Sequence, residues 1–393
     1  MMSHGVLFNE KFMNDHMCLW SGHGWDTLGA RTHEALSADG TMSGPKPVYR
    51  TMALCRQIYM RAVLSTSDPV MCRMQSFILL KRLQDVCWDS VKGEGWYFSI
   101  DESGFPADPR KDLYTHAFVI LAASAAFRTF CESWILEIAR KAVEVTCRLF
   151  SLADHSWLAS SLDISGVPVD RRLIQNPHMH LFEALMAFAL VSRRPEDYGR
   201  VRRLVTIFPR LLHPRIQMIA EFFTQDGQPE DGDRALIEPG HQFEWAWLLY
   251  SYALYFCHDS TESRTWYTHA SDLLRLGLEY GVDHEYGGVF NVIDASGRII
   301  DDRKRIWPVT EALKATSVLL PGKVPVFLDL LQAHYLRPGG RWIETCDKFL
   351  RPVDWELKAT TGYHLATAWQ ELPPNRQNAG VYASLCAEPL AVP

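Results

Sequence analysis

Residues 238–249 read EPGHQFEWAWLL, and they have the pattern of a buried helix with ionisable groups on one face. Pro239 stands in the first turn, where a helix tolerates proline, and a long apolar and aromatic run follows it. His241 and Glu244 are three residues apart and share a face, with Trp245 one turn after His241. A lone histidine on an apolar helix is more often a core residue with a hydrogen-bonding partner. A functional interpretation therefore requires that the pattern recur elsewhere.

The pattern recurs in residues 176–184, NPHMHLFEA, where His180 and Glu183 again stand three residues apart. We expect Asn176 to cap this helix, with Pro177 at its first position. Two copies of His-x-x-Glu also raise the possibility of a metal site. Carboxylate-bridged di-iron bundles, however, use the reverse order, and the sequence contains no His-Glu-x-x-His. We therefore expect no metal.

Three further clusters place aromatic and ionisable residues at expected helix starts. They are KRIWPVTEA at 304–312 with Trp307 and Glu311, TGYHL at 361–365 with His364, and DLYTHAF at 112–118 with Tyr114. Glu311 has a second explanation, because a carboxylate near a helix N-terminus interacts favourably with the helix dipole. The sequence has no Gly-x-Gly-x-x-Gly, Walker loop or nucleophile elbow. The remaining imidazoles, arginine, carboxylates and indoles suit general acid–base chemistry on a neutral sugar.

Helical periodicity dominates the chain. Met52, Cys55 and Tyr59 form one face of a helix, and Arg56 points inward with them because it follows Met52 by four residues. We expect other helices at about 70–88, 113–130, 133–150, 177–193, 198–212, 240–257, 264–280, 307–320, 325–336 and 359–371, and near 20–35 and 215–223.

A repeat in the connections indicates how these helices assemble. Asp-x-Ser-Gly occurs at 101–104, 163–166 and 294–297, and strand-like residues precede the first and last copies, as in short hairpins. Chance is the alternative, since these residues all favour turns. A period of about 62–66 residues covers the chain about six times, with two helices per unit. Because a helical hairpin cannot bury its apolar face alone, such units must stack or close into a ring.

We therefore predict an all-α fold, an (α/α)6 barrel of six helical hairpins with short β-hairpins in the long loops. The sequence contains no linker of the Pro/Ser/Gly type that would separate two units. We expect a single domain over residues 1–393, with a Pro-rich tail from about 373.

Composition excludes several classes of function. The chain has 393 residues, 47% of them hydrophobic, and a net charge of −6, which is typical of a globular protein rather than one that binds nucleic acid. Its longest basic run is 303–305, which either meets an anionic group on a substrate or forms a solvated loop; we favour the loop.

No stretch approaches the ~20 apolar residues of a membrane span, and no signal peptide is evident. Nine cysteines without a Cys-x-x-Cys fit reduced thiols. We expect a cytoplasmic monomer or homodimer without nucleic-acid or membrane partners.

Taken together, the motifs resemble the N-acylglucosamine 2-epimerase superfamily of sugar epimerases and isomerases. The matching stretches, in the order of the family, lie at 56–59, 112–118, 176–184, 239–249, 307–312 and 363–364. The version Gly-His-x-Phe-Glu-Trp at 240–245 is similar to that of the aldose–ketose isomerase branch, the mannose and sulfoquinovose isomerases. Epimerase branches tend to have Ile-Glu-Ala at 243–245.

This resemblance implies an (α/α)6 barrel and a small-molecule sugar substrate, with neither metal nor nucleotide cofactor. His241 and His364 would be an acid–base pair that moves a proton from C2 of an open-chain aldose through a cis-enediol. Arg56 would stabilise the oxyanion at O1 or O2, and Glu244 would orient His241 or hold a sugar hydroxyl. The remaining substrate-binding residues would be Tyr114, Asn176, His180, Trp307 and Glu311.

Three alternatives stay open at the level of sequence. A 2-epimerase acting on N-acetylglucosamine would use the same proton removal and return the proton to the other face of C2. A glycoside hydrolase would need two carboxylates about 5–10 Å apart, which Glu183, Glu244 and Glu311 could supply. A carbohydrate-binding module would bind sugar without forming a product.

Overall fold

The computed structural model describes residues 7–373 except 45, 47, 93, 153–156 and 171. The tail expected beyond about 373 lies outside the described residues. The α-helices are α1 (Glu10–Ser21), α2 (Thr51–Val63), α3 (Pro69–Asp85), α4 (Leu113–Phe130), α5 (Ser133–Leu149), α6 (Gln175–Ser192), α7 (Pro195–Val205), α8 (Phe208–Leu211), α9 (Pro239–Tyr255), α10 (Ser260–Tyr280), α11 (Ile306–Leu319), α12 (Val324–Leu330) and α13 (Thr361–Glu371). Three shorter helical turns are η1 (Gly232–Arg234), η2 (Pro321–Lys323) and η3 (Leu331–Tyr335).

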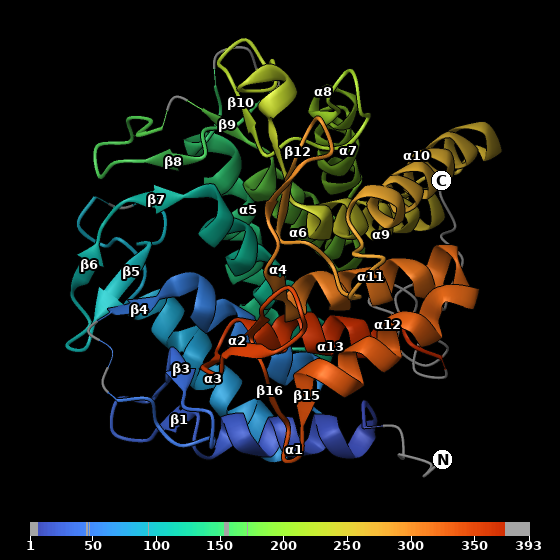
Figure 1. Ribbon diagram of the computed structural model, residues 1–393. Coiled ribbons are helices and arrows are strands. Elements are labelled where there is room, and N and C mark those ends of the chain that lie inside the picture. The colour runs from blue at the N-terminus through green and yellow to red at the C-terminus, as the bar shows by residue number, and fades with distance from the viewer. Residues whose placement is uncertain are drawn as a thin grey trace.

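Within the described part of the chain, α2, α4, α6, α9, α11 and α13 form a closed ring. Each contacts the next, and α13 returns to α2 (Figure 1). These inner helices are buried on nearly all sides, which explains why their sequences are apolar around the whole helix. By length and composition α4 could also cross a membrane, but 78% of it is buried within the structure, as in the core helix of a globular protein.

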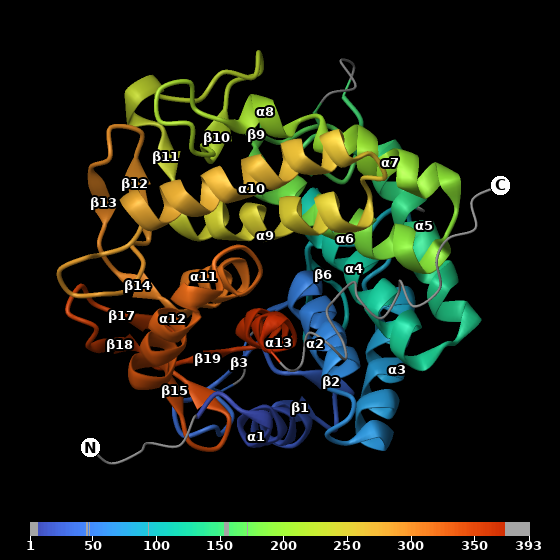
Figure 2. The same cartoon turned by 90° about the vertical axis from the view of Figure 1, so that its right-hand side faces the viewer.

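The outer helices cover the ring from outside. α3, α5, α7, α10 and α12 pack against α2, α4, α6, α9 and α11, the inner helix that precedes each in the chain (Figures 1 and 2). The sixth pair joins the two ends of the described chain, because Phe8, just before α1, packs against Trp369 of α13 with ring centroids 5.7 Å apart. Gly362 of α13 makes room for His16 of α1, since a Cβ at 362 would lie 2.8 Å from the imidazole. The expected arrangement of paired helices closed into a helical barrel is confirmed.

Short strands connect the helices. They are β1 (Trp25–Asp26), β2 (Arg31–Thr32), β3 (Ala35–Leu36), β4 (Val48–Arg50), β5 (Ser99–Asp101), β6 (Pro106–Asp108), β7 (Lys111–Asp112), β8 (Ser161–Leu162), β9 (Leu173–Ile174), β10 (Phe222–Phe223), β11 (Leu236–Ile237), β12 (Val292–Asp294), β13 (Ile299–Asp301), β14 (Lys304–Arg305), β15 (Leu336–Arg337), β16 (Arg341–Trp342), β17 (Thr345–Cys346), β18 (Pro352–Asp354) and β19 (Leu357–Lys358).

These strands fix one end of the barrel. A strand directly precedes every inner helix (β4, β7, β9, β11, β14 and β19), and each pairs antiparallel with a strand of another connection (β5, β8, β10, β12, β17 and β3). The three Asp-x-Ser-Gly segments form the expected turns, with Gly104, Gly166 and Gly297 at φ of +88°, +84° and +84°. In Figure 2 the hairpin β12–β13 lies at this end, on the left. All six inner helices therefore begin at the same end.

Two expected helices are wrong. The segment near 20–35 contains the end of α1 and the hairpin β1–β2, because Asp26 accepts hydrogen bonds from the Gly29 amide and from Arg31. The segment near 215–223 is a turn and β10, and the Ile219 amide donates to Gln242 of α9 instead of a helical carbonyl. In contrast, α1 was not expected, although Asn9 caps it and its buried residues have helical spacing.

Candidate active site

A cavity of about 200 Å³ lies at the end where the inner helices begin. Its lining residues are Arg56, Tyr114, Asn176, His180, Glu238, His241, Glu244, Arg305, Trp307 and His364. All six inner helices contribute to it. Eight of the nine site residues predicted from the sequence line this cavity, and only Glu311 does not.

The two predicted acid–base residues, on α9 and α13, both line this cavity. His241 of α9 packs against the Trp307 indole with centroids 5.0 Å apart, and His364 of α13 packs against the same indole at 5.7 Å. Both imidazoles are largely buried, with 4% and 6% of their residue surface exposed. One ligand in the cavity can therefore contact both rings.

His241 is held by a buried carboxylate, Glu221, in the connection before β10. The Nδ1–H of His241 donates to Glu221 Oε1 at 2.9 Å. Glu221 Oε2 accepts from the Gln175 amide at 2.9 Å, and Gln175 Oε1 accepts from the Trp245 indole at 2.9 Å, which fixes the orientation of the amide. Burial lowers the pKa of His241, but Glu221 and Glu238 outweigh burial and raise this pKa to about 9. The ring is therefore an imidazolium at neutral pH, with its Nε2–H available to a ligand.

This geometry predicts the effect of replacing Glu221. Glu221→Gln keeps a hydrogen-bond acceptor for Nδ1–H but removes the anion that favours the charged ring. If catalysis requires protonated His241, activity in wild type falls as pH rises through about 9. In the variant this alkaline limb of kcat/KM is expected to move at least about one pH unit lower. The exposed Glu285 provides a control, since Glu285→Gln should leave the limb in place; an unmoved limb in Glu221→Gln would contradict the assignment.

His364 has the opposite environment. Its Nδ1 lies 2.7 Å from Glu311 Oε1, and its Nε2 lies 3.3 Å from Arg56 Nη1. A guanidinium only donates, so Nε2 accepts from Arg56, and the ring proton sits on Nδ1 and is donated to Glu311. Burial, followed by the charges of Arg56 and Lys314, holds the pKa of His364 well below its usual value. His364 is therefore a neutral ring with its Nε2 lone pair on the side of Arg56, in the cavity wall.

The Arg56 guanidinium lies at the cavity and is held there by hydrogen bonds and aromatic rings. Its Nη2 donates to the Tyr114 hydroxyl at 2.7 Å, and Nη1 donates to the Thr360 carbonyl at 3.2 Å. The aromatic rings of Phe118 and Tyr363 flank it, with the guanidinium carbon 4.4 and 4.8 Å from their centroids. A cation held in this way is placed to stabilise negative charge that develops on a ligand oxygen.

Two buried oxygens of the cavity wall have no hydrogen-bond partner. They are Asn176 Oδ1 and Glu244 Oε1. The expected capping role of Asn176 is wrong: α6 begins at Gln175 after the uncapped Ile174, which leaves the Asn176 side chain in the cavity wall. Because unsatisfied buried acceptors are costly, these two atoms are suited to accept hydrogen bonds from sugar hydroxyls.

His180 and Glu183 form the pair expected from their spacing. His180 Nδ1 lies 3.2 Å from Glu183 Oε2, and burial lowers the pKa of His180 to about 4 although Glu183 opposes this shift. Glu183 also accepts a hydrogen bond from the Tyr363 hydroxyl. The neutral ring of His180 lines the cavity beside Tyr114, with centroids 4.8 Å apart.

Two groups in the described chain have metal-ligand chemistry. They are His180, Glu183 and Glu244, and Glu221, Glu238 and His241, with ligand atoms within 4.8 Å of one another in each group. In both groups protein donors already occupy a carboxylate: the Tyr363 hydroxyl binds Glu183, and Gln175 binds Glu221. The expectation that catalysis requires no metal stays a prediction.

A family model of N-acylglucosamine 2-epimerase (GlcNAc 2-epimerase) matches residues 32–368, most of the chain. This protein belongs to the N-acylglucosamine 2-epimerase family. The resemblance seen in the motifs is thereby confirmed.

Proteins similar to this chain in sequence include isomerases of mannose and of mannose 6-phosphate. The chain is 28% identical to a protein named mannose-6-phosphate isomerase from Rhizobium meliloti (strain 1021), over 72% of this chain and 76% of that protein. It is 26% identical to a D-mannose isomerase from Thermobifida fusca, over 58% of each chain. A crystal structure of D-mannose isomerase superposes with a TM-score of 0.83 at 20% identity, covering 94% of this chain and 99% of that chain. The helical barrel is therefore the fold of this family.

Some residues of the site were missed or misplaced by sequence reasoning. Glu311 does not line the cavity as expected; it lies behind His364 and is fully buried. Glu244 lines the cavity as predicted. Of its two expected roles, the contact with His241 is made by Glu221 instead, and binding of a sugar hydroxyl stays a prediction. The sequence signal for Glu221 was weak, because it lies in a connection 20 residues before its partner.

The basic run 303–305 has three separate roles. Arg303 is exposed and paired with Asp301, as expected of a solvated loop. For the other two residues that expectation is wrong: Lys304 is fully buried and paired with Asp283 at 2.6 Å, and Arg305 lines the cavity. Arg305 was missed because the cavity reaches the residue just before α11.

Gly240 in the Pro-Gly-His motif is required by close packing. A Cβ at this position would lie 2.4 and 2.5 Å from the Trp307 ring, and a rigid indole can make room for it only by moving as a whole. We expect Gly240→Ala to displace Trp307 from its place between the two imidazoles and to lower kcat/KM by about 10-fold, the scale of an overpacking strain of 1–3 kcal/mol. Gly322→Ala is the matched control, because a Cβ there meets nothing within 4 Å. Equal activity of the two variants would contradict this packing role.

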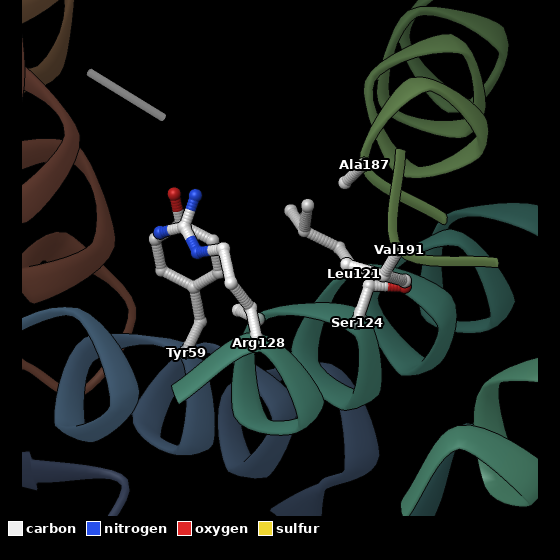
Figure 3. A pocket seen from close by; sticks show the side chains of 7 residues that line it. Tyr59, Leu121, Ser124, Arg128, Ala187 and Val191 are labelled. Carbon is white, nitrogen blue, oxygen red and sulfur yellow. The ribbon is translucent and has the colours of Figure 1, made fainter. Parts of the chain in front are cut away.

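The barrel also holds a much smaller cavity. A second cavity of only about 10 Å³ lies toward the far ends of α2, α4 and α6, between Tyr59 and Arg128 on one side and Leu121 and Val191 on the other (Figure 3). The Tyr59 ring packs against Tyr363, with centroids 5.2 Å apart. The polar cavity, at about 200 Å³, is therefore the larger of the two.

Proposed function

We propose that this protein is an aldose–ketose isomerase that interconverts a mannose-type aldose and its 2-ketose through a cis-enediol intermediate. One observation carries the proposal: two imidazoles with opposite protonation preferences flank one indole in a single cavity. The names of two relatives, a mannose-6-phosphate isomerase and a D-mannose isomerase, support it. We further propose that residues 1–393 form a single (α/α)6 barrel.

Neutral His364 is the base in this proposal. Its Nε2 takes the proton from C2 of the open-chain aldose, and the C–H electrons form the C1–C2 double bond. His241, as an imidazolium, donates its Nε2 proton to O1, which gives the enediol. His364 then returns its proton to C1 while His241 removes the proton from O2, and C2 becomes the ketone. Both rings end as they began, and the step needs no oxidant or reductant.

The other cavity residues bind and orient the sugar. Arg56 stabilises the negative charge that develops on O1 or O2 in the transition state, since its guanidinium lies 3.3 Å from the base. Asn176 and Glu244 accept hydrogen bonds from sugar hydroxyls through their unpartnered oxygens. Tyr114 and His180 bind further hydroxyls, and Trp307 packs on the sugar.

A neutral sugar fits the charges of the cavity better than a phosphorylated one. Arg305 offers one cation to the cavity, but the Glu238 carboxyl group lines the same space, and the charge of Arg305 acts on this group. A phosphate beside Arg305 would therefore also meet an anion. We propose free mannose as the substrate, and mannose 6-phosphate, named for one relative, as the competing substrate to be tested.

The second candidate is 2-epimerisation, which the family name favours. It shares proton removal from C2 but returns the proton to the opposite face of C2. A glycoside hydrolase is disfavoured because Glu183 and Glu311 are already bound to Tyr363 and His364.

The test is incubation with mannose, mannose 6-phosphate and N-acetylglucosamine in deuterated water, followed by chromatography and NMR of the products. We expect fructose from mannose, with deuterium at C1 of fructose and at C2 of recovered mannose. N-acetylmannosamine from N-acetylglucosamine would instead establish the epimerase. Binding without product or exchange would contradict both.

A further inference from the structure

A lysine lies completely buried in the barrel, behind the wall of the site. Lys314 of α11 has no exposed surface, and neither does Glu311, one turn earlier on the same helix. Lys314 Nζ lies 2.7 Å from Glu311 Oε2, so the two groups form a fully buried ion pair. The ammonium also lies 4.0 Å from the centroid of Trp247 on α9. Removing a cation from water at this depth is costly, so a stability role alone is a weak explanation.

The surroundings keep Lys314 charged. Burial lowers the pKa of this lysine, but the nearby carboxylates of Glu311, Glu244 and Glu183 outweigh burial and raise the pKa above its usual value. These carboxylates come from three different inner helices, α11, α9 and α6. The ammonium is therefore a permanent positive charge inside the ring.

An unbroken series of contacts joins this charge to the proposed base. Lys314 contacts Glu311 Oε2, and Glu311 Oε1 accepts from His364 Nδ1 at 2.7 Å. On the other side of the imidazole, Nε2 faces Arg56. His364 thus lies between the Glu311 carboxylate, whose charge is balanced by Lys314, and the Arg56 guanidinium.

We propose that Lys314 is a positioning residue that acts through Glu311: its fixed charge keeps His364 neutral, with the proton on Nδ1 and Nε2 unprotonated. This inference rests on the proposed function only in naming His364 as the base. The contacts that carry it are independent of the substrate.

The physical reason is the proton affinity of the Glu311–His364 pair. The charged or titratable groups that face the pair are Arg56 on α2, His180 and Glu183 on α6, Glu244 on α9, Lys314 on α11 and the Tyr363 phenol on α13. Without Lys314, two carboxylates and only one fixed cation remain beside the pair, so it binds an extra proton at higher pH. That proton goes either to Nε2 or to Glu311, which would then donate to Nδ1. Both outcomes place a hydrogen on Nε2 and remove the base.

The test compares Lys314→Met and Lys314→Gln, which remove the charge, with Lys314→Arg, which keeps it. Gln can still donate one hydrogen bond to Glu311, so it serves if the Met variant does not fold. NMR of ¹⁵N-ring-labelled histidine reports the charge and tautomer of His364, with the signal assigned by its loss in His364→Asn. We expect the His364 titration and the acid limb of kcat/KM to move at least about one pH unit higher in the neutral variants. In Lys314→Arg both should stay in place.

The outcomes separate this inference from the proposed function. If Lys314 served only the packing, all three variants would lower thermal stability or kcat, and the titration of His364 would not move; that result would overturn the inference. A shifted titration in a protein without isomerase activity would support the coupling and reject the function. If the His364 titration does not shift in the neutral variants and the protein is an active isomerase, the coupling is rejected and the proposed function is supported.

Discussion

His364→Asn is expected to lower kcat for the mannose–fructose interconversion at least about 100-fold, the usual scale for a general acid–base group. Asparagine can still donate to Glu311 Oε1, which the imidazole does at 2.7 Å, but it cannot take a proton from carbon. Exchange of the C2 hydrogen with deuterated water should fall by the same factor, because one base performs both. The fold should persist, since this position lines a cavity rather than filling the core.

A second buried histidine provides the control for this variant. His178 of α6 has both ring nitrogens bound to backbone, at 3.0 Å to the Leu158 amide and 2.8 Å to the Ile174 carbonyl. His178→Asn should lower thermal stability while the folded enzyme keeps turnover within a few-fold. Near-normal turnover and exchange in His364→Asn would remove this residue from the mechanism.

His241→Asn is expected to have an effect of similar size, at least about 100-fold on kcat. The variant keeps a donor for Glu221 but loses the only proton that the cavity can deliver to O1 from an imidazolium. Its residual activity should also lack the alkaline limb near pH 9 that the charged ring gives to wild type. A pH profile of kcat/KM measures both effects, and a limb that persists near pH 9 in the variant would assign it to another group.

Local signals in the sequence were sufficient to predict the inner helices and most of the residues that line the cavity. Pro239 begins α9 as expected, and the paired spacing of His180 and Glu183 becomes a direct contact. Residues in the first turns of helices that repeat at a regular period must meet at one end of a closed ring. This is why motifs as distant as Arg56 and His364 could be placed together before the fold was known.

What the sequence did not predict depends on contacts between distant segments. Glu221 lies in a connection without periodicity, and only the fold brings it to His241. Lys314 has the spacing of an ordinary helical ion pair with Glu311, and its full burial follows from the closure of the ring. The prediction of a helix near 20–35 was wrong because Trp25 pairs with Thr32 in a hairpin instead.

A contact between two helices also explains why Glu311 does not line the cavity. Its position in the first turns of α11 predicted a substrate contact, but the His364 ring lies between it and the cavity. Sequence spacing gives the face of a helix, whereas the side chain of the neighbouring helix decides which residue on that face reaches the ligand.

The central claim is that His241 and His364 carry opposite protonation states in one cavity. Ring ¹⁵N chemical shifts of the two histidines, measured at pH 7.5 on the unliganded protein and assigned with the two asparagine variants, test it most directly. We predict a doubly protonated ring for His241 and a neutral ring with its proton on Nδ1 for His364. Two neutral rings, two charged rings, or a proton on Nε2 of His364 would contradict the mechanism.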